Sequence, residues 1–156
     1  WYGMLYYKVI QKKYKRKTLY TLLAWKGKDK LTSQKIIEVM GFDNKGMPKF
    51  GIVPFEMDKK KSVRVIFEYA ADVTMSVKYN EKEEMIIFDH LAPKESSLAG
   101  QYQYYGPDMS FDGLKFKKGK WQYVADVDAR GPKDSKDKLY NKEPVKRQEK
   151  DMYKPR

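Results

Sequence analysis

Residues 62–70 read SVRVIFEYA, and the apolar side chains in this stretch occur at every second position. The alternating side chains that share one face of an extended chain are Val63, Val65, Phe67 and Tyr69. A period of two is typical of a β-strand with one buried face. Residues 73–79 repeat the alternation, and a polar turn at 80–84 then leads into the apolar residues 85–88. These segments predict a β-hairpin.

The other apolar segments indicate more strands joined by short polar turns. Segments 4–10 and 18–25 are apolar on both faces, so we expect them to lie centrally in a sheet, joined by a basic loop at 11–17. The remaining predicted strands are 36–42, 49–53, 111–116 and 121–127. With about nine strands in all, the sequence predicts an all-β, antiparallel meander that forms either a sandwich or a barrel.

Two segments carry helical signals. Residues 31–40 contain Thr32 and Ser33, either of which could cap a helix. However, Ile36, Ile37 and Val39 are β-branched and favour a strand, which is the interpretation we adopt. Residues 96–100 are expected to form a single helical turn.

The charge divides the chain into two parts. Of 156 residues, 33 are Lys or Arg and 21 are Asp or Glu, which gives a net charge of +12. Residues 130–156 hold 10 of the basic and 5 of the acidic side chains, with little apolar surface. We therefore expect a β domain over 1–129 and a basic tail over 130–156 that is flexible or docked at the periphery.

Composition excludes several classes of protein. The absence of cysteine rules out disulfides, thiolate metal sites and a cysteine nucleophile, and the single histidine rules out multi-histidine metal centres. No apolar run approaches the ~20 residues of a transmembrane helix. Because the chain starts at Trp1, we expect it to be a piece of a longer protein.

Five segments, read in order, carry a resemblance to a known family. They are YGMLYYK (2–8), YTLLAW (20–25), RVIFEY (64–69), IFDHL (87–91) and GPDMSFDG (106–113). Over roughly residues 1–129 the chain resembles a family of uncharacterised proteins from Bacteroidetes. The resemblance implies an exported protein, periplasmic or secreted. It implies no activity and assigns no catalytic residue.

An aromatic cluster is the first candidate binding site. It consists of Tyr102, Tyr104, Tyr105 and Trp121. If residues 102–105 are extended, an exposed row of flat rings could stack on sugars or bases. The alternative is that these rings pack within the sheets, where aromatic residues are favoured.

A candidate calcium loop follows. Asp108, Ser110, Asp112 and Gly113 match the first, third, fifth and sixth positions of a calcium-binding loop, where short oxygen ligands alternate and a glycine allows a sharp turn. The match fails at the twelfth position, where Gly119 stands in place of glutamate. The alternative is an ordinary turn that leads into a strand.

Basic loops and the histidine complete the candidates. Lysines crowd the segments 12–17, 59–61 and 115–120, and together these could bind nucleic acid or anionic headgroups. Arginine is scarce and no nucleic-acid-binding motif is present, so solubility is the alternative explanation. A hydrolase would require His90 to lie in a cleft beside a carboxylate and a hydroxyl, and a structural histidine is the alternative.

These observations predict a non-catalytic, exported binding or interaction module, whose ligand is a glycan, an envelope component or a protein. The alternative is a carrier in which a closed barrel encloses a small apolar ligand. Nucleic-acid binding and hydrolysis rank below both. No cofactor is predicted apart from the calcium ion that the loop at Asp108 could hold.

Overall fold

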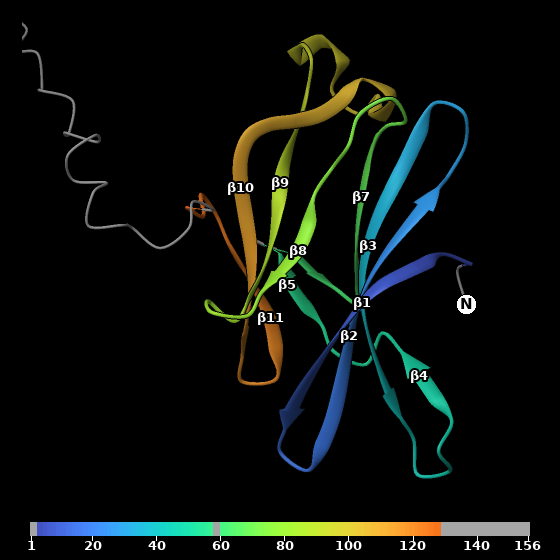
Figure 1. Ribbon diagram of the computed structural model, residues 1–156, viewed down its shortest axis with the longest axis vertical. Helices are drawn as coiled ribbons and strands as arrows, with labels where there is room; N and C mark the ends of the chain where they lie inside the picture. The colour runs from blue at the N-terminus through green and yellow to red at the C-terminus, as the bar shows by residue number, and fades with distance from the viewer. Residues whose placement is uncertain (1–2, 58–59, 129–156) are drawn as a thin grey trace, which may run out of the picture.

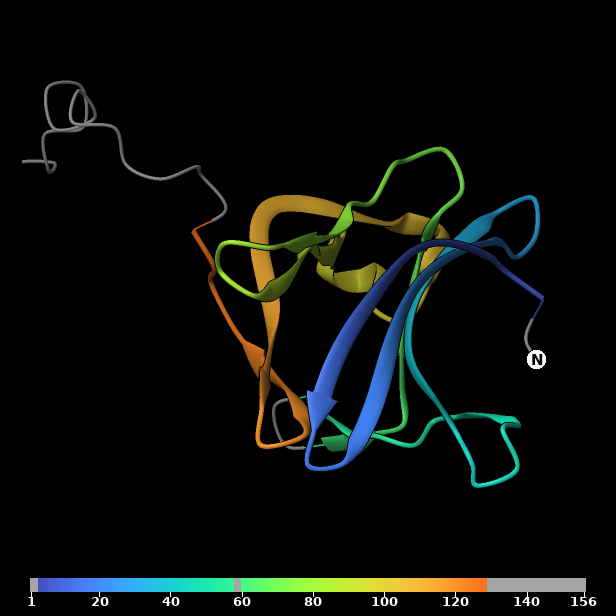
Figure 2. The same ribbon diagram turned by 60° about the horizontal axis from the view of Figure 1, so that its bottom comes forward.

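The computed structural model describes residues 3–57 and 60–128, which form two β-sheets that face each other (Figures 1 and 2). These residues contain eleven strands and two short 3₁₀ helices. The all-β prediction is confirmed, and of its two architectures the sheets form a sandwich and not a closed barrel. The predicted tail, 130–156, lies outside the described residues.

The first sheet has five strands and is built around β3. Its order is β1-β2-β3, and β4 and β7 both pair with β3, at different parts of that strand. Every pairing in this sheet is antiparallel. The strands are β1 (Leu5–Tyr14), β2 (Lys17–Gly27), β3 (Thr32–Phe42), β4 (Pro48–Phe50) and β7 (Arg64–Ala70).

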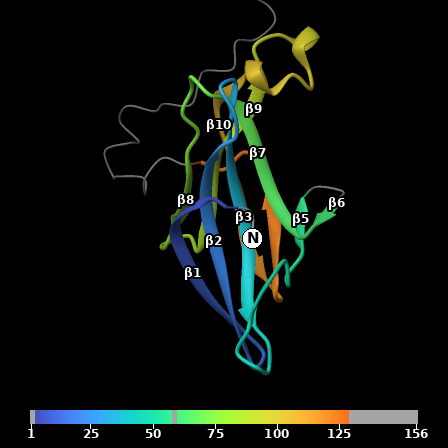
Figure 3. The same ribbon diagram turned by 90° about the vertical axis from the view of Figure 1, so that its right-hand side faces the viewer.

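The second sheet has six strands in the order β6-β5-β11-β10-β9-β8. Its pairings are antiparallel except for the parallel contact between β5 and β11. The strands are β5 (Phe55–Met57), β6 (Lys60–Ser62), β8 (Val77–Asn80), β9 (Met85–Pro93), β10 (Tyr105–Lys117) and β11 (Lys120–Val124). The 3₁₀ helices η1 (Ser96–Leu98) and η2 (Tyr102–Tyr104) lie between β9 and β10 at one end of the molecule (Figure 3).

The β1–β2 hairpin differs from the prediction. We expected residues 4–10 to be central in a sheet, but β1 is an edge strand, and only β2 is internal. The predicted basic loop is mostly strand, because β1 continues to Tyr14 and β2 begins at Lys17. An edge strand keeps one side open to water, so it tolerates the lysines that led us to predict a loop.

The predicted hairpin around residue 80 is confirmed. Its first strand, β8, is shorter than predicted, and its second strand, β9, is longer. Residues 73–76 are not a strand. At Ser76 the backbone N–H donates to the Asp89 carboxylate at 2.7 Å, while the Ser76 carbonyl oxygen accepts from the Asp89 N–H at 3.1 Å. In β7, the side chains of residues 65, 67 and 69 face the core as predicted, but Val63 is 59% exposed. It precedes β7 at a bend between two strands. Residues 32–42 form a strand and not a helix, and residues 96–98 form the predicted helical turn.

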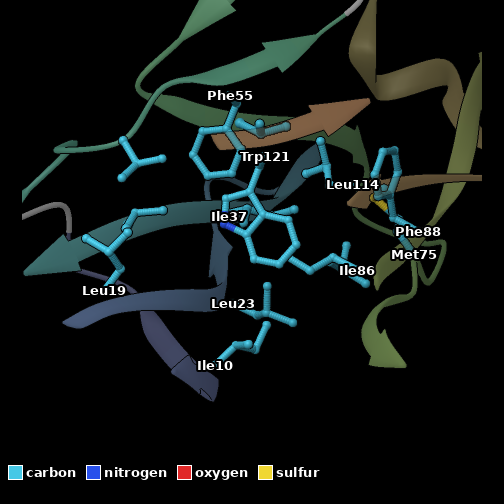
Figure 4. Close-up of a cluster of buried hydrophobic side chains, with 14 of the residues drawn as sticks. Ile10, Leu19, Leu23, Ile37, Phe55, Met75, Ile86, Phe88, Leu114 and Trp121 are labelled. Carbon is cyan, nitrogen blue, oxygen red and sulfur yellow. The ribbon is translucent and has the colours of Figure 1, made fainter. Parts of the chain in front are cut away.

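The core lies between the two sheets, with Trp121 in its centre (Figure 4). The indole is fully buried and packs its ring against Phe116 in an edge-to-face contact at 5.2 Å. Ile37 and Leu23 come from the first sheet, and Phe55 and Leu114 come from the second. The described residues include no helix with the length and hydropathy required to cross a bilayer.

Candidate functional site

The predicted aromatic cluster is divided between the core and one end of the molecule. Trp121 is buried in the core and cannot contact a ligand at the surface. Tyr102 and Tyr104 are 45% and 39% exposed, but they belong to η2 and not to a strand. The Tyr104 N–H donates to the carbonyl oxygen of Gln101, and this turn breaks the expected row of rings.

Tyr105 has a local structural role. Its hydroxyl accepts a 2.9 Å hydrogen bond from the backbone N–H of Gly100, and its ring lies 5.2 Å from that of Tyr102. These contacts tie the end of η2 to the preceding loop. The prediction of an aromatic face on a sheet is therefore wrong for this group.

The residues of the predicted calcium loop hold the chain locally. Asp108 Oδ1 accepts hydrogen bonds from the Ser110 N–H at 3.0 Å and from the Ser110 hydroxyl at 2.7 Å, and these bonds lower the pKa of Asp108. The loop coincides with an irregularity in the pairing of β9 with β10, between Pro107 and Phe111. Residues 108–110 therefore form an irregularity within β10 that the Asp108 side chain holds, whereas the alternative interpretation was a turn leading into a strand.

Asp112, the third predicted calcium ligand, is buried and makes other contacts. Its Oδ2 lies 2.7 Å from His90 Nδ1, and its Oδ1 accepts a hydrogen bond from the Asp126 N–H at 3.2 Å. In the part of the chain that the structure describes, no group of three or more His, Asp or Glu side chains is placed to hold a metal ion. The geometry therefore lends no support to a calcium site at Asp108, Ser110 and Asp112.

Residues from three hairpin turns line a basic cleft. In Figure 1 these turns lie in the lower half of the molecule. The turns are those of β1–β2, β3–β4 and β10–β11, and the cleft has a volume of about 1470 Å³. Seven cationic side chains line it: Lys15, Arg16, Lys17, Lys45, Lys49, Lys118 and Lys120. Asp43 is the one carboxylate among its described lining residues.

The close approach of two turns depends on Gly119. This residue has a φ of +80°, and a Cβ at this position would lie 2.5 Å from ring atoms of Tyr14. The missing side chain lets the β10–β11 turn rest against Tyr14, at the end of β1. Contact between residues 105 positions apart in the sequence thus brings Lys118 and Lys120 to the same cleft as Lys15.

Asp43 orders the β3–β4 side of the cleft. Its Oδ1 accepts hydrogen bonds from the N–H groups of Lys45 and Met47, at 2.9 and 3.0 Å. The other oxygen, Oδ2, lies 3.7 Å from Lys49 Nζ. An aspartate that caps a turn in this way holds the following residues in place. The carboxylate therefore orders this turn, and its single negative charge is outnumbered by the cations among the described lining residues.

Most of the cations in the cleft have no carboxylate partner among the described residues. Lys120 pairs with Glu56 at 2.8 Å, and Lys49 lies near Asp43. Within the described part of the chain, the other five cations have no carboxylate within salt-bridge distance: Lys15, Arg16, Lys17, Lys45 and Lys118. Like charges gathered around a concave surface raise the local concentration of anions.

Aromatic rings stand among these cations. Tyr14, Tyr20 and Phe42 line the cleft, and the rings of Tyr20 and Phe42 meet edge to face at 5.9 Å. Phe42 is 57% exposed, which leaves much of its ring open to solvent. Lys15 Nζ lies 5.5 Å from the centre of the Tyr14 ring. The cleft thus combines cationic groups with flat apolar surfaces.

Sequence reasoning found part of this site. Two of the three predicted lysine clusters meet in the cleft, through Lys15 to Lys17 and through Lys118 and Lys120. Of the third cluster, Lys61 does not line it, and Lys59 lies outside the described residues. The prediction missed Lys45, Lys49 and the three rings. No local pattern marks these residues, because the pairing of β3 with β2 and β4 alone places them beside the basic turns.

In comparisons with protein-family models, curated proteins and solved structures, nothing matched this chain.

Proposed function

We propose that this protein is a non-catalytic binding module for an acidic glycan, which it holds in the basic cleft. The observation that carries the proposal is the ratio of charges, seven cations to one carboxylate, around a cleft that also contains aromatic rings. In keeping with the resemblance to exported proteins, we place the ligand among the acidic polysaccharides of the cell envelope.

The positive charge supplies the attraction for an anionic chain. Five cations lack a carboxylate partner among the described residues, so an incoming anion need not break an existing ion pair. Each sulfate or carboxylate bound would release counterions from the polyanion, as in other complexes between basic proteins and polyanions. The affinity should therefore fall steeply with salt concentration.

The rings supply contact for the sugar faces. Tyr20 and Phe42 offer adjacent apolar surfaces beside Lys45 and Lys49. Flat apolar patches suit the C–H faces of pyranose rings, and the neighbouring lysines suit charged substituents. A volume of about 1470 Å³ exceeds the roughly 300–1,000 Å³ typical of small-molecule pockets. This size favours a ligand of several linked sugars over a single small molecule.

The type of cation favours a glycan over a nucleic acid. Arg16 is the single arginine among the lining residues that the structure describes, and the other six cations are lysines. Arginine is the usual group for planar, bidentate recognition of phosphates and bases, whereas lysine acts as a point charge with little directional preference. Point charges are sufficient for an irregularly sulfated or carboxylated chain.

The experiment is a binding titration by calorimetry with four probes. Heparin represents sulfated glycans, polygalacturonate carboxylated glycans, dextran neutral glycans, and oligo(dT) single-stranded nucleic acid. We expect binding of heparin and polygalacturonate that weakens as salt rises from about 0.05 to 0.2 M, with no binding of dextran. Oligo(dT) should bind more weakly than heparin.

A matched pair of triple variants locates the site. The cleft variant is Lys15→Gln, Arg16→Gln, Lys118→Gln, and the control is Lys78→Gln, Lys82→Gln, Lys94→Gln. The three control lysines are exposed and lie outside the cleft, so both variants lose the same charge. We expect the affinity for heparin to fall about tenfold or more in the cleft variant and severalfold less in the control.

Substitution of one ring tests whether the aromatic side chains of the cleft contribute to binding. Phe42→Ala removes an exposed ring without opening the core, and we expect severalfold weaker binding of both acidic glycans. Equal losses in the two triple variants would overturn the proposed location. Tighter binding of oligo(dT) than of heparin would replace the glycan with a nucleic acid.

A further inference from the structure

We propose a second binding site, distinct from the basic cleft, in which His90 receives a hydrogen bond from a small molecule with an apolar body and a hydroxyl or amine group. The site is a pocket of about 340 Å³ between the two sheets. Its lining residues are Met57, Phe67, Phe88, Asp89, His90, Leu91, Asp112 and Tyr123, none of which lines the basic cleft.

The register of the second sheet turns two polar residues toward the inside of the sandwich. Asp112 pairs with Phe88, and the next inward pair along β10 and β9 is Leu114 with Ile86. Phe88, Ile86 and Leu114 belong to the core. His90 lies two residues beyond Phe88 on β9 and contacts Asp112. The inner face of these strands is apolar up to this point, and a histidine and an aspartate stand at its end.

The walls of the pocket are apolar and come from both sheets. Phe67 of β7 and Phe88 of β9 pack with their ring centres 4.6 Å apart, which joins the sheets beside the pocket. Met57 and Tyr123 add a flexible thioether and a third ring. The volume lies near the lower end of the roughly 300–1,000 Å³ found for small-molecule sites, and an apolar lining with few polar groups is typical of them.

The contact with Asp112 determines which ring nitrogen of His90 is left available to a ligand. The Nδ1–H donates to Asp112 Oδ2 at 2.7 Å, and the N–H of Asp126 holds the other aspartate oxygen. In the neutral imidazole, a proton on Nδ1 leaves Nε2 as a hydrogen-bond acceptor. The side chain of His90 is 45% exposed, so an entering molecule can reach this ring. A ligand hydroxyl or amine is the complementary donor.

The surrounding charge also favours a donor over an anion. The carboxylates of Asp112, Asp108 and Asp126 all lie near His90, and together with the hydrogen bond to Asp112 they raise its pKa. Asp89 also lines the pocket, with its carboxylate bonded to the backbone of Ser76. An anionic ligand would meet these carboxylates, whereas a neutral or cationic donor would not be repelled.

Of the described residues that line the pocket, Tyr123 is the one that carries a hydroxyl. A serine or threonine nucleophile is thus not among them, and the paired histidine and aspartate do not complete a hydrolase site of the predicted kind. The pocket is an opening between two sheets and not the interior of a barrel, so it also differs from the predicted carrier. Binding is the function that this arrangement supports.

The test uses nuclear magnetic resonance of the imidazole, which is unambiguous because the chain contains one histidine. The probes are 2-naphthol and 2-naphthoate, which share a two-ring body and differ in the polar group. Above the pH range in which the His90 resonances titrate, where the imidazole is neutral, we expect 2-naphthol to shift the Nε2 resonance and to bind at least fivefold more tightly than 2-naphthoate. Equal binding of the two probes would overturn the inferred donor group.

Two variants test whether His90 makes the hydrogen bond to 2-naphthol. His90→Phe keeps a ring but removes Nε2, and we expect affinity for 2-naphthol to fall about threefold to tenfold, as for the loss of one hydrogen bond. Tyr104→Phe removes an exposed hydroxyl outside the pocket and should leave affinity unchanged. Unchanged affinity in His90→Phe would overturn the role of His90. Heparin binding should be the same in both variants, which separates this site from the proposed glycan cleft.

A pH series on the unmodified protein gives an answer that does not depend on the folding of a variant. Protonation occupies the Nε2 lone pair, so affinity for 2-naphthol should fall as the pH is lowered through the raised pKa of His90, which the His90 resonances report in the same series. Binding that is constant across this titration, or no shift of the His90 resonances at millimolar 2-naphthol, would overturn the proposal.

Discussion

The indole Nε1–H of Trp121 donates a 2.9 Å hydrogen bond to the Thr21 hydroxyl, across 100 residues of sequence and from one sheet to the other. Trp121 lies in β11 and Thr21 in β2, and both side chains are buried. An indole placed in a core needs a partner for its N–H, and this threonine provides one. The bond therefore satisfies a buried donor and also aligns the two layers.

Thr21→Val should destabilise the fold. Valine has nearly the shape of threonine but no hydroxyl, so the Trp121 N–H would remain buried without an acceptor, at a cost of about 1–3 kcal/mol. Chemical denaturation with urea measures the change. Thr21→Ser keeps the hydroxyl and should cost less than Thr21→Val. Equal stability of Thr21→Val and the unmodified protein would show that the bond contributes nothing.

Arg64→Met should destabilise the fold more strongly. The Glu38 carboxylate is almost fully buried and accepts hydrogen bonds from Arg64 Nε at 2.8 Å and Nη2 at 2.6 Å, and from the Tyr6 hydroxyl. Removing the guanidinium leaves a buried charge without its counter-ion, which costs about 3–5 kcal/mol. Thermal and urea denaturation at neutral pH measure the loss.

The double variant Glu38→Met, Arg64→Met provides the control. It removes both charges, so most of the stability lost in Arg64→Met should return. If the double variant is as unstable as Arg64→Met, the cost comes from lost packing and not from the unpaired carboxylate.

His90 should make the stability depend on pH. Its pKa is raised in the folded protein, first through the hydrogen bond to Asp112. The histidine therefore stabilises the fold fully below its unfolded pKa of about 6.5, and this contribution is lost as pH rises through the higher folded value. The effect should stay below about 1 kcal/mol, because the imidazole is nearly half exposed.

The stability difference between the unmodified protein and His90→Gln, measured by urea denaturation, should shrink from about pH 5 to pH 9. A difference that is constant over this range would contradict the prediction.

Gly119→Ala should disturb the basic cleft. Alanine would adopt an unfavourable positive φ at this position, and its Cβ would also collide with the ring of Tyr14. Gly46 provides a matched control, because its φ is +76° but nothing lies within 4 Å of a Cβ there. Both variants should lose about 1 kcal/mol from the strained φ. Only Gly119→Ala should also weaken heparin binding, as calorimetry can test. Equal binding by both variants would mean that the contact with Tyr14 does not shape the cleft.

The local pattern was sufficient to predict most strands. Alternation in residues 64–70 predicts β7, and the β-branched residues near Ile36 favour the strand that the structure contains at β3. Predictions were wrong where a side chain from another strand or a short local turn replaces the expected extended pairing. The carboxylate of Asp89 replaces a ladder bond at Ser76, and the turn at Tyr104 removes a predicted row of rings.

By itself, the sequence determined the all-β class, most of the strands and the local clustering of lysines, because these depend on interactions between near neighbours. Only the tertiary structure decided which turns meet. The order of strands brings Lys15, Lys45 and Lys118 around one cleft, and the pairing of β9 with β10 places His90 beside Asp112. These contacts join residues that are distant in the chain, and they follow from burial of Trp121 and its neighbours between two sheets. No local pattern records which residues such a core brings together.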